Sequence, residues 1–327
     1  MTDPLPTHDD VRRAAERIRA VATVTPLIES PLLNEELGGR LLVKCEMLQR
    51  TGSFKFRGAY NRISTIPEAE RKGGVVAFSS GNHAQGVAAA ALMLGVKAAI
   101  VMPRDAPRLK IDNTRAFGAE VVLYDRFGES RDEIAARLSR ERGSTLVKPF
   151  DDPGVISGQG TIGLEIASQT KALGTVPDAV LAGCSGGGLI AGIALGLSAD
   201  LPKTTVYSVE PAGLDDMARS LESGRPEKND PAARSICDAL LAPTPGDITF
   251  AIAKQRLKGG LAVTDAEVRK AMALAFRHFK IVCEPGGAVG IAAVMTGKVP
   301  TKGRTVVVVA SGGNVDPLLF QEVLATA

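Results

Sequence analysis

The sequence contains few of the residues that characterise metal-rich, disulfide-bonded or nucleic-acid-binding proteins. It has no tryptophan, 4% aromatic residues, three histidines and four cysteines, and the cysteines are scattered without close pairing. This scatter indicates neither a zinc site nor a disulfide framework, so each cysteine is expected to be a small buried hydrophobe. The 39 basic and 36 acidic residues form no basic block, and few aromatic rings are available to stack on bases. Nucleic-acid binding is therefore unsupported.

Long hydrophobic runs are also missing. No apolar stretch approaches the ~18 residues needed to span a bilayer, and the N-terminal sequence MTDPLPTHDD lacks the apolar core of a signal peptide. We therefore expect a cytoplasmic protein that does not bind membranes. The 327 residues, of which 45% are hydrophobic and 23% charged, suffice for one large or two ordinary globular domains.

Short apolar runs alternate with segments of helical spacing along the chain. The strand-like runs are 41–43, 75–78, 98–102, 121–124, 179–182, 205–209 and 305–310. Helical spacing is found at 8–22, 83–94, 107–117 and 128–141, and residues 259–265 lead into a helix capped by Thr264 or Asp265. The alternation predicts parallel strands with helical crossovers, the α/β class, and the four valines at 306–309 predict a fully buried strand.

Lys55 lies between two phenylalanines, close after a turn signal and just before an apolar periodic run that predicts a helix. Desolvation and the positive end of the helix dipole both disfavour an ammonium group there, so the pKa of Lys55 should fall. A neutral amine can form a Schiff base with a carbonyl cofactor. A lysine taken alone is more often a solvated residue on a helix face, so this interpretation depends on the motifs that follow it.

Three glycine-rich clusters each follow an expected strand, the position where open parallel sheets bind ligands. In the first, 79–83, backbone N–H groups at a helix start suit a substrate carboxylate. In the second, 184–189, three consecutive glycines let backbone amides close on a phosphate. The third, 311–314, places a serine at a strand end, and each cluster alone is compatible with an ordinary turn. Together with Lys55 they supply what pyridoxal phosphate requires: aldehyde capture and partners for the substrate carboxylate, the phosphate and the pyridine nitrogen.

Five motifs occur in this order: GSFKFRGA at 52–59, SSGNHAQG at 79–86, GQGTIGLEI at 158–166, SGGGL at 185–189 and SGGNVD at 311–316. The chain that carries them resembles the serine/threonine dehydratase and serine racemase family of pyridoxal-phosphate enzymes, which has the tryptophan-synthase-β fold. The resemblance implies fold type II, with two open parallel-sheet domains and flanking helices. It further implies a large cofactor-binding domain of residues 1–72 and 146–327, an inserted small domain at 73–145 that closes over the substrate, and a homodimer.

The resemblance also implies roles for individual residues. Lys55 would be the Schiff-base lysine, and Ser80 would face it across the cofactor. The implied cofactor-binding residues are Lys55, Phe54, Asn82, Ser185, Gly186, Gly187, Gly188, Leu189 and Ser311. The implied substrate-binding residues are Ser79, Ser80, Gly81, Asn82 and His83.

The segment EPAGLDD at 210–216 resembles the divalent-cation site of the family. Glu210, Asp216 and the backbone carbonyl of Leu214 would supply hard oxygen ligands. Such ligands suit Mg²⁺, Mn²⁺ or Ca²⁺ and not zinc, which prefers nitrogen and sulfur.

The implied reaction is α,β-elimination of water from a β-hydroxy amino acid of the L-threonine or L-serine class, which yields a 2-oxo acid and ammonia. Lys55 would remove the Cα proton. Because Ser311 is a neutral partner for the pyridine nitrogen, the ring is a weaker electron sink than with a carboxylate partner. This favours early loss of the β-leaving group.

Four alternatives stay open. Dehydration of 3-hydroxyaspartate would need an arginine that pairs with a second carboxylate, for which Arg50, Arg57 and Arg115 are the candidates. Racemisation of serine or aspartate would use Ser80 to reprotonate Cα from the opposite face, but Phe150, which resembles the dehydratases, favours elimination. β-Replacement, as in cysteine synthases, and a cofactor-binding or regulatory protein without turnover are the other two.

Overall fold

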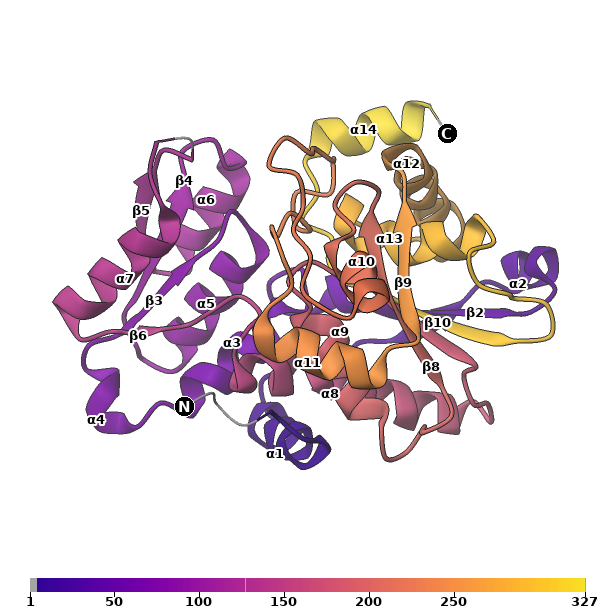
Figure 1. The fold of residues 1–327 in the computed structure, drawn as a ribbon, viewed down its shortest axis with the longest axis horizontal. Coiled ribbons are helices and arrows are strands. Elements are labelled where there is room, and N and C mark those ends of the chain that lie inside the picture. Colours follow the sequence, from indigo (N-terminus) through magenta and orange to yellow (C-terminus); the bar gives the residue numbers. More distant parts are fainter. Residues whose placement is uncertain (1–4, 127, 327) are drawn as a thin grey trace.

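The computed structural model describes residues 5–126 and 128–326 and contains two β-sheets that lie side by side, each flanked by helices (Figure 1). The α/β class, predicted from the alternation of apolar runs and helical segments, is confirmed. Among the helices in these ranges, we find none with the length and apolar character needed to cross a bilayer.

The smaller sheet has four parallel strands in the order β5-β4-β3-β6. Its strands are β3 (Val75–Phe78), β4 (Ala98–Pro103), β5 (Glu120–Tyr124) and β6 (Thr145–Leu146), and its helices are α5 (Asn82–Met93), α6 (Arg108–Ala116) and α7 (Arg131–Arg142). Val75 and Ala77 of β3 belong to the core under α5, whereas Val76 and Phe78 belong to the core under α7. Because both faces of β3 are buried, its sequence is a continuous apolar run.

The larger sheet has six strands in the order β1-β2-β10-β7-β8-β9. They are β1 (Leu27–Glu29), β2 (Arg40–Cys45), β7 (Ala179–Gly183), β8 (Thr205–Pro211), β9 (Gly259–Val263) and β10 (Thr305–Ala310). The edge strand β1 runs antiparallel to β2, and the other pairs are parallel. The strand that comes latest in the sequence therefore lies in the interior of the sheet. Its four valines at 306–309 are buried, alternately against the two faces, as predicted.

Helices α8 (Pro153–Ala172) and α9 (Gly188–Leu197) cover one face of this sheet, and α12 (Asp265–Leu274) and α13 (Pro285–Met295) cover the other. An added Cβ atom on Gly196 of α9 would lie 2.3 Å from the carbonyl oxygen of Gly160 of α8, so glycine permits this close helix contact. Thr264 caps α12, as predicted. Further helices are α1 (His8–Ile18), α2 (Pro31–Leu37), α3 (Lys55–Ser64), α4 (Glu68–Arg71), α10 (Asp216–Ser223), α11 (Asp247–Arg256) and α14 (Pro317–Ala325), with a 3₁₀ turn at Glu46–Leu48 and a π-helical turn at Ala275–Phe279.

A cluster of buried charges joins α3 to β2 and α8. Arg57 pairs with Glu46 (Nε to Oε2, 2.8 Å) and with Glu165 (Nη1 to Oε1, 2.6 Å). Lys44 shares Glu165 (Nζ to Oε2, 2.5 Å), and Arg57, Glu46 and Lys44 are fully buried. Burial alone would raise the pKa of Glu46, but the Arg57 guanidinium holds it below its usual range. The cluster therefore fixes the first turn of α3, which begins at Lys55.

Candidate active site

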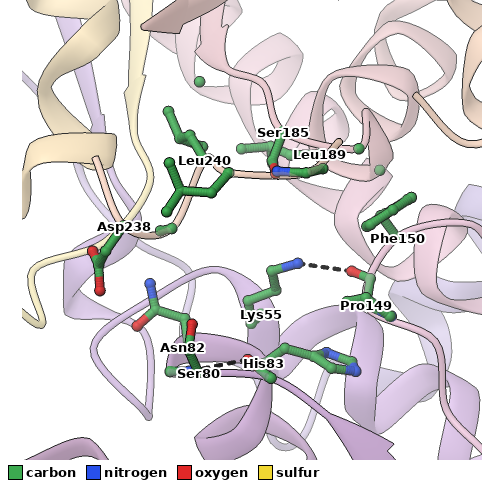
Figure 2. A pocket seen from close by; sticks show the side chains of 18 of the residues that line it. Lys55, Ser80, Asn82, His83, Pro149, Phe150, Ser185, Leu189, Asp238 and Leu240 are labelled. Carbon is green, nitrogen blue, oxygen red and sulfur yellow. Dashed lines mark hydrogen bonds between the residues drawn. The ribbon is translucent and has the colours of Figure 1, made fainter. Parts of the chain in front are cut away.

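A cavity of about 150 Å³ lies between the two sheets, where β3, β7 and β10 end (Figure 2). Segments from distant parts of the chain meet there. Every cofactor-binding and substrate-binding residue predicted from the sequence lines this cavity: Phe54, Lys55, Ser79, Ser80, Gly81, Asn82, His83, Ser185, Gly186, Gly187, Gly188, Leu189 and Ser311.

Lys55 is the first residue of α3, and its side chain extends into the cavity. Its Nζ donates a hydrogen bond to the carbonyl oxygen of Pro149 at 2.7 Å and lies 5.2 Å from the centre of the Phe54 ring. Ser185 and Leu189 lie across the cavity from it (Figure 2). Burial lowers the pKa of Lys55 from 10.5 to about 8. Roughly a tenth of the amine is therefore neutral, and nucleophilic, at pH 7, far more than for an ordinary lysine.

The turn at 79–83 (the 79–83 turn) joins β3 to α5 and presents the start of that helix to the cavity. The first amides of a helix have no acceptor within it, so they are available to an anion. His83 is buried, and its Nε2 lies 3.0 Å from the carbonyl oxygen of Val147. Burial, and then the charge of Lys55, lowers the pKa of His83 to about 3. His83 is therefore neutral and does not itself attract the anion by charge.

The loop at 185–189 (the 185–189 loop) joins β7 to α9 and admits no side chains at its glycines. A Cβ atom on Gly186 would lie 2.3 Å from the ring of Phe150, and one on Gly187 would lie 2.8 Å from Met217. Gly187 also has φ +95°, a left-handed conformation that favours glycine. Close packing and backbone conformation therefore require glycines in this loop. Without side chains in the way, its backbone N–H groups at the start of α9 can approach a phosphate.

Ser311 follows β10 and lies beside the start of α13. Among the described residues, the one hydrogen-bond acceptor of its Oγ is the carbonyl oxygen of Gly286, at a long 3.5 Å. The hydroxyl is therefore available to a ring nitrogen as a neutral hydrogen-bond partner. The amine, the two helix starts and this hydroxyl are the donors that pyridoxal phosphate with an amino-acid substrate requires, so these residues fit that cofactor.

The sequence nominated Arg50, Arg57 and Arg115 to bind a second carboxylate, but none of the three lines the cavity. Arg57 is held by the buried cluster described above, Arg115 pairs with Asp112 on α6 (3.6 Å), and the Arg50 guanidinium lies 5.9 Å from the centre of the Phe56 ring. Within the described ranges, the arginines that line the cavity are Arg126 and Arg131.

Several other lining residues escaped the sequence analysis because their role depends on long-range contacts. They are Lys110, Arg126, Arg131, Pro149, Asp238 and Glu284. The carbonyl group of Pro149 carries no sequence signal at all. Lys110 and Arg131 lie on helices with many charges, where a basic residue normally indicates a solvated face.

Glu210 and Asp216 lie together at the end of β8 and the start of α10. The two oxygens of Glu210 accept the amides of Met217 and Ala218, both at 2.9 Å, and Oδ1 of Asp216 accepts Nδ2 of Asn229 at 2.5 Å. Oδ2 of Asp216 is buried and has no hydrogen-bond partner among the described residues. Burial raises the pKa of Asp216 to about 6, and burial followed by the charge of Asp216 raises that of Glu210. Two adjacent buried carboxylates, one of them with an unpartnered oxygen, fit a divalent ion. In the described ranges, however, no group of three or more acidic, histidine or cysteine side chains is arranged to hold a metal ion.

A lysine whose pKa is lowered to about 8, between an anion-binding turn and a glycine cradle at the ends of parallel strands, defines the class. Such a protein is an α/β enzyme of the tryptophan-synthase-β-like type that uses pyridoxal phosphate.

Comparisons with known proteins identify the family. A family model described as "Pyridoxal-phosphate dependent enzyme" matches residues 18–312, and the chain belongs to this family. The chain is 44% identical over 312 residues to an L-threo-3-hydroxyaspartate ammonia-lyase of Pseudomonas sp, with 95% of this chain and 96% of the relative covered. It is 39% identical over 312 residues to a serine racemase of Schizosaccharomyces pombe, with 95% of each covered. The solved structure of a threonine deaminase from T.th. matches with a TM-score of 0.89 at 45% identity, covering 95% of this chain and 99% of that one. The resemblance inferred from the five motifs is confirmed.

The pKa of Lys55 predicts how the apo-protein takes up its cofactor. Only the neutral amine attacks an aldehyde, so covalent uptake of pyridoxal phosphate should accelerate roughly tenfold per pH unit below the pKa and level off above it. With a pKa of about 8, the rate should be constant above pH 9. Stopped-flow absorbance measures this rate, and borohydride reduction followed by peptide mapping locates the label. A rate that still rises at pH 10, or a label on another lysine, would contradict the assignment.

Proposed function

We propose that this protein is a pyridoxal-phosphate-dependent ammonia-lyase that converts a β-hydroxy amino acid of the L-threonine or L-serine class to a 2-oxo acid and ammonia. The observation that carries the proposal is the Lys55 amine, whose pKa burial lowers to about 8, in one cavity with the 79–83 turn. A base with a pKa near the working pH is well suited to proton abstraction. The similarity to an ammonia-lyase along nearly the whole chain supports this choice.

Each group in the cavity has a proposed role. The 79–83 turn binds the α-carboxylate of the substrate, and the 185–189 loop binds the cofactor phosphate. Lys55 removes the Cα proton, and Ser80 faces it from the other side. Ser311 offers the pyridine nitrogen a neutral partner. Pyridoxal phosphate, when bound, supplies the electron withdrawal that makes the Cα proton acidic.

The basic residues of the smaller sheet favour 3-hydroxyaspartate as a second candidate substrate. Arg126 and Arg131 both line the cavity. Both arginines make exposed ion pairs, which are weak. Arg126 contacts both oxygens of Asp105, at 3.1 and 3.0 Å, whereas Arg131 contacts its neighbour Asp132 only at 3.4 Å. Arg131 is therefore the freer of the two to bind a second carboxylate. Arg131 also lies over the Phe78 ring, 5.1 Å from its centre, which holds the guanidinium at the wall of the cavity.

A substrate panel with one matched pair of variants tests both candidates. The wild type should release 2-oxo acid from at least one of L-serine, L-threonine and the 3-hydroxyaspartate isomers, and Lys55→Ala should release none. Arg131→Met should lower kcat/KM for 3-hydroxyaspartate by roughly 10- to 100-fold, because a charge-assisted hydrogen bond is lost, and should leave serine and threonine nearly unchanged. Arg137→Met on the same helix is the control, because Arg137 is exposed and contacts only Glu141 among the acidic residues described.

Other outcomes of the panel would each identify an alternative. Dominant formation of D-amino acid with little oxo acid would make the protein a racemase, the activity named for the similar protein of Schizosaccharomyces pombe. Neither oxo acid nor inversion from a cofactor-loaded protein would indicate a binding protein without turnover. An equal loss on all substrates in Arg131→Met would remove the second-carboxylate role.

We also propose a divalent cation, Mg²⁺, Mn²⁺ or Ca²⁺, held by Glu210, Asp216 and the backbone carbonyl of Leu214. The buried and unpartnered Oδ2 of Asp216 supports it. β8 ends beside β7, and Met217 of α10 lies against Gly187 of the phosphate loop. A cation there would order the cofactor site and would not take part in the chemistry.

Metal removal tests this site. A chelator should lower the melting temperature of the loaded enzyme and weaken its hold on the cofactor, and added Mg²⁺ should restore both, because the cation screens two buried carboxylates. Asp216→Asn should abolish the response. Asp215→Asn is the control, because Asp215 is the adjacent carboxylate and pairs with Arg219. If Asp216→Asn responds to the chelator as the wild type does, the site is elsewhere.

We further propose a homodimer. Phe276 and Leu318 remain 42% and 70% exposed, and the Phe276 ring packs edge-on against Phe320 at 5.9 Å between centres. Exposed large apolar side chains on these helices support contact with a second copy. Light scattering should give twice the mass of the chain, and a monomer mass would contradict the proposal.

A further inference from the structure

Lys110 is a buried cation on α6 that meets two carboxylates from the other side of the cavity. Its Nζ lies 2.7 Å from Oδ2 of Asp238 and 3.8 Å from Oε2 of Glu284. Only 5% of the residue is exposed. Its side chain runs along the 79–83 turn, where a Cβ atom on Gly81 would lie 2.8 Å from Cδ of Lys110. Burial alone would lower the pKa of Lys110, but Glu284 and Asp238 hold it above its usual value.

Glu284 in turn determines which way the side-chain amide of Asn82 faces. An ionised carboxylate can only accept hydrogen bonds, and Oε1 of Glu284 accepts one from Nδ2 of Asn82 at 2.5 Å. On the other side, Nδ2 of Asn314 donates to Oδ1 of Asn82 at 2.8 Å. These two partners define the orientation of the amide and leave its second N–H to donate into the cavity that Asn82 lines.

The orientation depends on Glu284 being ionised. The pKa of Glu284 is raised to about 7 as the net result of four effects. Burial, the largest, raises it, and so does the charge of Asp238. The charge of Lys110 and the hydrogen bond from Asn82 lower it. Without the ammonium group, the fully buried carboxyl would keep its proton at neutral pH. A protonated carboxyl can donate to the amide oxygen, which removes the preference for one orientation.

We infer that Lys110 is a positioning residue that acts through Glu284 to hold Asn82 as a hydrogen-bond donor toward the ring oxygen of the bound cofactor. The inference rests on the proposed cofactor contact of Asn82 and not on the choice of substrate. Lys110 belongs to the smaller sheet and both carboxylates to segments of the larger one. The donor is therefore in place only when the two parts of the molecule meet as they do here.

Absorbance of the loaded protein, recorded without substrate, tests the inference, because a donor at the ring oxygen determines the position of the visible band. Lys110→Met should shift this band at saturating cofactor and weaken cofactor binding by roughly tenfold or more, because it leaves Glu284 buried without its cation. Lys110→Arg, which keeps the charge, should retain the wild-type band. Glu284→Gln in the Lys110→Met background should recover most of the binding and the band, because the amide accepts from Asn82 without needing a counter-charge.

Two further variants separate this role from simpler ones. Asp238→Asn keeps Lys110 beside Glu284, so the band should not move; if this variant reproduces Lys110→Met, the lysine acts only as a tie between the two sheets. Arg108→Met removes an exposed cation from the same helix, whose partner is Asp112 four residues on, and should change nothing. An unchanged band in Lys110→Met, or losses that simply multiply in the double variant, would overturn the inference. Because these spectra need no turnover, they decide it even if the ammonia-lyase assignment fails.

Discussion

The position of Lys55 depends on the buried guanidinium of Arg57, two residues further along α3. Arg57 bridges Glu46, which follows β2, and Glu165 in the middle of α8, and none of the three lines the cavity. Buried ion pairs of this kind contribute little net stability, because desolvation offsets their attraction, but they accept very few geometries. The cluster therefore acts mainly as a constraint on where α3 begins. A lysine with four rotatable bonds can present its amine reproducibly only from such a fixed backbone.

Both sheets contribute residues to the cavity. The larger sheet supplies the 185–189 loop and Ser311 from the ends of adjacent interior strands, so their spacing is set by the hydrogen-bonded register of β7 and β10. The smaller sheet supplies the 79–83 turn and the basic residues Lys110 and Arg131. In the proposed assignment, the larger sheet would bind the cofactor phosphate and the smaller sheet the substrate carboxylates. The two kinds of anion would therefore be bound by different sheets.

The sequence predicted the elements whose signal is local and failed where the signal is shared between distant segments. β3 and β10 were predictable because a strand buried on both faces is apolar throughout. β9 was not predictable, because it begins with two glycines and has mostly half-buried residues. α8 was not predictable either, because its four glycines lower the helix propensity of the segment. The structure needs several of these glycines, since they let α8 pack closely against its neighbours. In the site, contiguous motifs identified the lysine, turn and cradle. The arginines could not be assigned, because a buried and a solvated arginine have the same sequence neighbourhood.

The strand order has a consequence for the synthesis of the protein. β10 is the last of the described strands to leave the ribosome, yet it separates β2 from β7, and the segment before Lys55 is bonded directly to its end through Phe54 N to Ser311 O (3.1 Å) and a bridge between Ser53 and Gly312. Until those residues emerge, a nascent chain exposes two unpaired strand edges and lacks Ser311, the proposed partner of the pyridine nitrogen. The interior of the larger sheet, and the contacts that join it to the segment before Lys55, can therefore form only after these late residues have been made.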